Sequence, residues 1–156
     1  MASPFPFTSG QVLTAAELNS IGEATAFTPS WTNLTVGNGT QSFYYAQVQD
    51  ILLIDGELVF GSTTAITGNV DFSNPVGTLA VSGVPIGIAY LADADGAGGA
   101  VARNKLATIS SAINQWRIFS QEVSGSLIQS KDLSSSSPFT WATGDRIRIS
   151  GKAVLS

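Results

Sequence analysis

The sequence predicts an all-β fold, a jelly-roll-like antiparallel β-sandwich that follows a short N-terminal arm and helix. Two observations lead to this fold class. From residue 27 the chain consists of short β-type segments, several of which alternate between apolar and polar residues, and Gly, Asn, Ser and Pro separate these segments at short intervals. The pattern gives about eight short strands with frequent turns, which is typical of sandwiches and jelly rolls. We therefore divide the chain into an anchoring arm with a short helix, residues 1–26, and a β-sandwich domain, residues 27–156.

Residues 3–10 predict an extended arm. Phe5 and Phe7 are interleaved with prolines there, a spacing that prevents regular structure and displays both rings. A free tail rarely exposes such rings. We therefore expect them to dock on another subunit or, alternatively, on the chain's own domain.

A short helix is predicted after the arm. Thr14 and Glu17 have the spacing of a capping box, and Gly22 can end the helix in the left-handed conformation. A helix of about two turns is marginal alone in water, so it has to pack on another surface. The apolar residues that we expect to anchor the arm and the helix to a partner are Phe5, Phe7, Leu13, Leu18 and Ile21.

The centre of the predicted domain is a hairpin within residues 43–68, which follows an edge strand at 31–36 and a turn at 37–39. One face of its strand 51–60 is apolar throughout, with Leu52, Ile54, Leu58 and Phe60. The opposite face carries two carboxylates beside Ile51, Leu53 and Val59. Because this second face is half apolar, we expect those three residues to form a subunit interface.

The rest of the chain continues the series of strands. The segments expected as further strands are 69–72, 86–91 paired with 101–110, 116–123, and a closing strand around Ile147 and Ile149. The Ala-rich stretch 105–116 can alternatively form a helical turn. The stretch 127–138 contains four consecutive serines and predicts a surface loop.

The composition excludes several classes of function. The chain has no Cys and no His, which removes thiol nucleophiles, the Ser-His-Asp and Cys-His constellations and most zinc sites. No two carboxylates are placed like a glycosidase pair. Asp93 and Asp95 before Gly96 resemble the start of a calcium loop, but the later acidic ligands are missing and a plain turn is the simpler interpretation. We therefore expect no enzyme activity, no cofactor and no metal.

The charge distribution argues against nucleic acid or a membrane as partner. Seven Lys and Arg residues are scattered through a chain of net charge −4, whereas phosphate binding needs clustered positive charge. Arg146 and Arg148 form a close basic pair, which we expect on a solvated or ion-paired strand face. The N-terminus lacks the regions of a signal peptide, and no run approaches the ~20 apolar residues of a membrane span. We expect synthesis in a cytoplasm and no membrane insertion.

Two tryptophans, Trp31 and Trp141, are candidates for contact with a glycan, because an indole offers a stacking face to a sugar ring. The structural alternative is that each indole packs at the rim of the core with its N–H bonded to a neighbour. The sequence leaves both interpretations open.

Three parts of the chain resemble a known group of proteins. They are FTSGQVLTAAELNSIG, then FTPSWTNLTVGNGT with FGSTTAITGNV, and finally PFTWATGDRIRISGKAVLS. These segments look like parts of tail-fibre, minor tail and head-decoration proteins of double-stranded DNA bacteriophages. The resemblance implies a protein of the virion surface, whose N-terminal segment attaches to the particle and whose β-sandwich assembles as a homotrimer.

The resemblance also leaves a choice of position on the particle. The chain has no shaft repeats or heptads, which favours a capsid decoration protein or short head fibre docked on the major capsid protein or a tail protein. The alternative is a tail-tip receptor- or glycan-binding module that contacts a host surface glycan. A hydrolase of surface polysaccharide is a third option, and the sequence shows no paired carboxylates for it.

Overall fold

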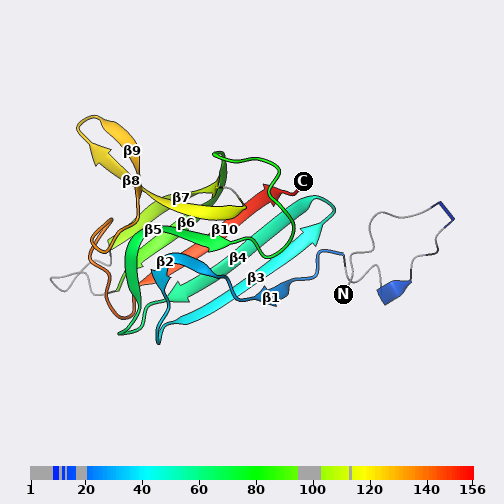
Figure 1. The fold of residues 1–156 in the computed structure, drawn as a ribbon, viewed down its shortest axis with the longest axis horizontal. Coiled ribbons are helices and arrows are strands. Elements are labelled where there is room, and N and C mark those ends of the chain that lie inside the picture. The colour runs from blue at the N-terminus through cyan, green and yellow to red at the C-terminus, as the bar shows by residue number, and fades with distance from the viewer. Residues whose placement is uncertain (1–8, 11, 13, 17–20, 95–102, 113) are drawn as a thin grey trace.

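The computed structural model describes residues 9–10, 12, 14–16, 21–94, 103–112 and 114–156. Within these residues the chain forms ten strands, all paired in antiparallel ladders, and no helix is among its elements (Figure 1). The predicted all-β antiparallel class is therefore confirmed. The strands are β1 (Thr25–Phe27), β2 (Trp31–Thr35), β3 (Thr40–Val48), β4 (Ile51–Val59), β5 (Ala65–Ser73), β6 (Pro85–Asp93), β7 (Arg103–Ala112), β8 (Gln115–Ser124), β9 (Leu127–Asp132) and β10 (Arg146–Val154).

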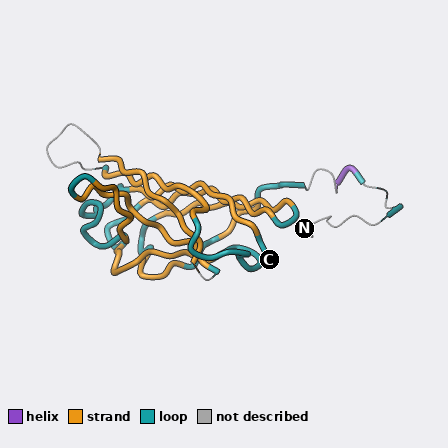
Figure 2. Tube along the Cα trace, turned by 90° about the horizontal axis from the view of Figure 1, so that it is seen from above, coloured by secondary structure: helices purple, strands orange, loops and turns teal. Residues whose placement is uncertain are grey.

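The strands form one hydrogen-bonded sheet in the order β1-β3-β4-β10-β6-β7-β8-β5-β2, and β9 pairs with β8 outside this path. The C-terminal β10 lies in the middle, because it pairs with β4 on one side and with β6 on the other. This position of β10 joins strands from both halves of the chain into a single ladder. Among the described strands, one strongly curled sheet therefore takes the place of the two separate sheets of the predicted sandwich (Figures 1 and 2).

The curl brings the two ends of the sheet across from each other. β2 lies at one end, and β3 lies next to the other end. Trp31 of β2 packs edge-on against Phe43 of β3, with ring centroids 5.7 Å apart, and its Nε1 donates to Gln41 Oε1 at 2.9 Å. Side chains thus connect β2, at one edge of the half-barrel, with β3, which lies next to the other edge.

The concave side of the sheet holds the core. The side chains predicted for the apolar face of the strand 51–60 are all buried: Leu52, Ile54, Leu58 and Phe60. Gly56 leaves a gap in this row that the ring of Phe43 fills, since a Cβ at Gly56 would lie 2.1 Å from the ring. Phe72 stacks on the fully buried Trp116, with centroids 5.8 Å apart. Aromatic rings therefore fill much of the space inside the curl.

The sheet forks at β8. The first residues of β8 pair with β5 up to Arg117 opposite Asp71, and its later residues pair with β9 from Phe119 opposite Asp132. Beyond the fork, the β8–β9 hairpin projects from the body of the sheet (Figure 1). The predicted surface loop is therefore wrong for residues 127–132, which form β9. Nearly all residues of β9 are exposed, so no alternation marked it as a strand.

The predicted arm and most of the predicted helix lie outside the described residues. Ala15 and Ala16 have helical backbone, and Gly22 has a φ of +73°, the left-handed conformation predicted for it. The sheet begins at Thr25, close to the predicted boundary at residue 27. Within the described part of the chain, no helix has the length and apolar character needed to cross a membrane.

Candidate functional site

The solvent side of β3, β4, β10 and β6 forms a continuous surface, which we name the outer face. The ladder register places its residues in rows across the four strands. One row holds Tyr44, Asp55, Ser150 and Ile88, and the next holds Ser42, Glu57, Arg148 and Tyr90. In these two rows the middle strands β4 and β10 carry charged and polar groups, while the flanking strands carry the exposed side chains of Tyr44, Ile88 and Tyr90.

An ion-paired cluster occupies the centre of the outer face. Glu57 Oε1 accepts hydrogen bonds from Arg148 Nε at 2.8 Å and from Arg146 Nη1 at 3.2 Å. The bond from Arg148 lowers the pKa of Glu57 below its ordinary value of 4.5; burial opposes this effect, and Arg146 adds to it. The same contact with Glu57 raises the pKa of Arg148. The expectation that the two arginines share an ion-paired strand face is therefore confirmed.

A shallow hollow of about 300 Å³ lies beside this cluster. Ile88 and Tyr90 of β6 border it on one side, and the Glu57–Arg148 pair borders it on the other. Ile88 is 56% exposed, so most of its aliphatic side chain is open to solvent. The hollow therefore offers an apolar contact next to a fixed ion pair.

The residues expected at a subunit interface lie on this outer face. Leu53 is exposed, whereas Ile51 and Val59 are half-buried. Leu53 and Asp55 lie on the same side of β4, and Asp55 is paired with Tyr44 of β3. The structure thus places Leu53 near the exposed ring of Tyr44. The subunit interface itself stays a prediction.

The tip of the β8–β9 hairpin, residues 123–128, is a second apolar surface outside the core. Val123 is 76% exposed, Leu127 64% and Ile128 74%. Val123 and Ile128 are direct partners in the ladder, so their side chains lie together on one side of the hairpin. Sequence reasoning missed this site, although VSGSLI, with a Ser-Gly-Ser turn between apolar residues, carries a hairpin signal.

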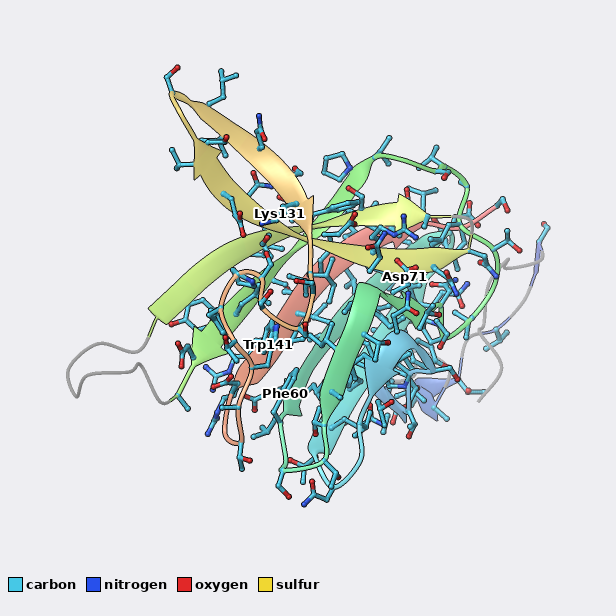
Figure 3. All side chains as sticks on the ribbon, turned by 60° about the vertical axis from the view of Figure 1, so that its left-hand side comes forward. Phe60, Asp71, Lys131 and Trp141 are labelled. Carbon is cyan, nitrogen blue, oxygen red and sulfur yellow. The ribbon has the colours of Figure 1, made fainter. Side chains whose placement is uncertain are left out.

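The base of the hairpin is held by polar contacts. Lys131 Nζ donates to Glu122 Oε2 at 3.1 Å, and the hydroxyl of Ser137 donates to Glu122 Oε1 at 2.7 Å (Figure 3 labels Lys131). Ser120 Oγ donates to the carbonyl oxygen of Lys131 at 3.1 Å. These contacts fix the direction in which the hairpin leaves the sheet.

The two tryptophans considered for a glycan contact lie in packed aromatic clusters. Trp141 stacks on Phe60, with centroids 4.7 Å apart and an interplanar angle of 13°, and its Nε1 donates to the carbonyl oxygen of Ser134 at 3.0 Å (Figure 3). Trp31 packs between Phe43 and Phe72. Both indoles are half-buried, and the N–H group of each donates a hydrogen bond. This arrangement matches the alternative prediction that each indole packs at the rim of the core. A glycan contact at either indole stays a prediction.

Of the expected anchor residues, Phe5, Phe7, Leu13 and Leu18 lie outside the described residues. Ile21 is described and half-buried, shortly before the sheet begins. The role of these residues in docking therefore stays a prediction.

Two buried carboxylates of the described residues, Asp71 and Asp145, are bound within the fold. Asp145 accepts hydrogen bonds from the backbone amides of Ala94 at 2.8 Å and Ala142 at 2.6 Å, so it ties two loops together. Asp71 is bound by Arg117. Over the described ranges, no three His, Cys, Asp or Glu residues are grouped closely enough to hold a metal ion, and Asp95 of the considered calcium loop lies outside those ranges.

Comparisons of the chain with protein-family models, with curated proteins and with solved structures find no match. The outer face and the hairpin tip are the two surfaces of the described residues where exposed apolar side chains gather outside the core. Both are suited to contact with other protein, because exposed apolar side chains that gather on a surface commonly mark an interaction site.

Proposed function

We propose that this chain is a non-enzymatic structural protein of a bacteriophage virion, displayed on the particle surface as a homotrimer. A capsid decoration protein or short head fibre is the form we favour. The resemblance of three segments to phage surface proteins supports the virion, and the two apolar surfaces outside the core support self-assembly. The observation that carries the proposal is that these two surfaces differ: one projects, and the other is a face with a hollow.

Two different surfaces are what a closed ring requires. In a cyclic trimer each subunit meets its neighbours through two unlike patches, whereas a two-fold dimer uses one patch twice. The hairpin tip of one copy, with Val123 and Ile128, would contact the hollow beside Ile88 and Tyr90 of the next. Apolar side chains that are exposed in the isolated chain would then be buried on both sides.

The size of the outer face also favours a contact that includes the hairpin. β4 and β10 pair over nine residues. Four strands of that length cover roughly 600 Å² at the usual strand spacing and rise per residue. A typical stable interface buries about 800 Å² on each partner. The face alone is too small, so the projecting hairpin would supply much of the remainder.

The N-terminal segment would attach the trimer to the particle. The sheet begins at Thr25, so the residues before it can bind the major capsid protein or a tail protein without breaking a ladder. The apolar anchor residues, Phe5, Phe7, Leu13, Leu18 and Ile21, would be buried in that contact. Each buried Å² of apolar surface would contribute about 25 cal/mol before the costs of association.

The jelly-roll-like sandwich of the sequence prediction belongs to the same proposal. The curl places β2 and β5 across the core from β3, as shown by the contacts of Trp31 and Phe72 with Phe43. The two halves of the sheet would thus act as the two layers of a sandwich.

Imaging of intact particles tests the proposal. Electron cryo-microscopy of the phage that encodes the chain, with the protein labelled by a bound antibody fragment, should show many copies on the head. A few copies at the tail tip would favour the receptor-binding alternative. Particles without the protein would overturn the virion assignment.

A further inference from the structure

A second hollow, separate from the outer face, lies where β7, β8 and β9 meet the loop before β6. Its volume of about 660 Å³ is within the range of about 300–1,000 Å³ that is usual for small-ligand sites. Among the side chains on its wall are Ser82, Ser110, Gln115, Arg117, Phe119 and Ser130. Hydroxyl and amide groups dominate this set, so the hollow suits a polar ligand.

Arg117 is fixed at the fork of the sheet, on the wall of this hollow. Its Nε and Nη2 donate to the two carboxylate oxygens of Asp71, at 2.6 and 2.9 Å. The Asp71 side chain is 4% exposed, whereas that of Arg117 is 35% exposed. The guanidinium therefore covers the carboxylate and keeps part of its own surface open. Because the pair has no net charge, it offers a ligand a positioned donor without a strong preference for anions.

The neighbouring polar groups are also available to a ligand. Gln121 Nε2 donates to Ser130 Oγ at 3.1 Å, which orients this hydroxyl and leaves its proton free to be donated. Ser110 lies directly opposite Arg117 in the ladder. In the described part of the chain, neither Ser110 nor Gln115 makes a side-chain hydrogen bond. These groups can both donate and accept.

Phe119 adds an aromatic ring to the same wall. It is half-buried and lies two positions beyond Arg117, on the same side of β8. A ring beside planar polar groups can pack against the C–H face of a sugar while the polar groups bind its hydroxyls. The hollow contains both parts of this arrangement.

We propose that this hollow binds a saccharide, a neutral ligand whose hydroxyls donate and accept hydrogen bonds. A phosphate or sulfate fits less well, because Asp71 already neutralises Arg117 and Asp132 adds a second negative charge nearby. An apolar ligand would leave the hydroxyls and Gln115 without partners, which is unfavourable. The site involves neither Trp31 nor Trp141, and it does not depend on assembly into a trimer.

The test is saccharide binding by the full-length protein. An array of fragments of bacterial surface polysaccharides identifies a binding saccharide, and isothermal titration calorimetry then measures its affinity. Gln115→Ala removes one amide, and Phe119→Leu removes the ring but keeps an apolar side chain. Each should weaken binding about five- to tenfold, the usual worth of one such contact. Gln129→Ala, at an exposed position of β9 outside the hollow, should leave the affinity unchanged.

Thermal unfolding of each variant distinguishes lost binding from lost folding. Three results would overturn the proposal: no binding to any saccharide of the array, binding that neither Gln115→Ala nor Phe119→Leu weakens, or displacement of the saccharide by low millimolar sodium sulfate. The last result would identify an anion site instead. None of these outcomes bears on the virion assignment, which rests on imaging.

Discussion

Asp71 of β5 and Arg117 of β8 form a two-pronged ion pair at the point where the sheet forks, with donor–acceptor distances of 2.6 and 2.9 Å. Arg117 is the last residue of β8 that pairs with β5. Two positions later β8 pairs with β9, starting at Asp132, whose charge also acts on Arg117. The hydrogen bond to Asp71 is the main cause that raises the pKa of Arg117. The Arg117 guanidinium thus interacts with one carboxylate on each branch of the fork, Asp71 of β5 and Asp132 of β9.

Removal of Arg117 should cost more stability than removal of its partner. In Arg117→Met the Asp71 carboxylate remains buried without a cation, and we expect a loss of about 3 kcal/mol in the free energy of unfolding. In Asp71→Asn the partly exposed guanidinium can turn to water, so the loss should be smaller. Urea unfolding of both variants and of the double variant measures the coupling. The double variant should recover part of the loss, and purely additive effects would contradict the interpretation.

Gly56 is expected to be intolerant of a side chain because of its contact with Phe43. A Cβ at Gly56 would lie 2.1 Å from the aromatic ring, so Gly56→Ala must displace the ring. We expect a loss of about 2–3 kcal/mol, in the upper part of the range for overpacked cores. Phe43→Leu should relieve the clash. In that background Gly56→Ala should therefore cost less in the free energy of unfolding than it does in the native protein. Chemical denaturation is the measurement, and equal costs in both backgrounds would argue against the contact.

The ion pairs of Glu57 make a pH-dependent contribution to stability. The pKa of Glu57 is lowered in the folded chain, so its contribution is present above its ordinary pKa of 4.5 and is lost as the pH falls through the lowered value. Glu57→Gln should therefore melt below the native protein at pH 7, and this difference should shrink in acid. Asp55→Asn, on the same face without a partner among the described residues, is the control. A difference that grows below pH 4.5 would have the wrong sign.

Deletion of residues 1–22 should leave a folded domain that no longer attaches to particles. The sheet begins at Thr25, and every ladder of the described residues lies after the deletion. Circular dichroism should report the same β-structure, with a melting temperature within a few degrees of the full chain. Co-sedimentation with particles measures attachment. Full attachment of the truncated protein would show that the anchor lies elsewhere.

Local pattern was sufficient to predict most of the strands, although β1 and β9 were not among those predicted. The strand 51–60 is an example, since its alternation correctly placed Leu52 and Ile54 in the core and Leu53 on the outer face. The predicted pairing of segment 86–91 with segment 101–110 is also confirmed, as the antiparallel pair β6 and β7. These features depend on neighbours in the sequence, which period and turn residues reveal.

Contacts between distant segments could not be predicted. The insertion of β10 between β4 and β6 converts the expected sandwich into one curled sheet, and no local signal specifies it. For the same reason the hollow beside Ile88 was missed, since its border comes from strands far apart in the chain. The ion pair of Asp71 with Arg117 likewise appears only once the fold brings β5 to β8.

Substitutions at the two apolar surfaces test how the proposed trimer is built. Ile128→Lys places a charge in the hairpin tip, where an apolar contact is expected, and should convert the trimer to monomers without changing the melting of the isolated domain. Val81→Lys, at an exposed apolar position away from both surfaces, is the matched control and should leave the trimer intact. Sedimentation velocity distinguishes the two species.

The molar mass of the purified full-length protein in solution tests self-assembly most directly. Light scattering at micromolar concentration should give about three times the 16.1 kDa of the chain. A single species of 16.1 kDa across the concentration range would contradict the proposed trimer.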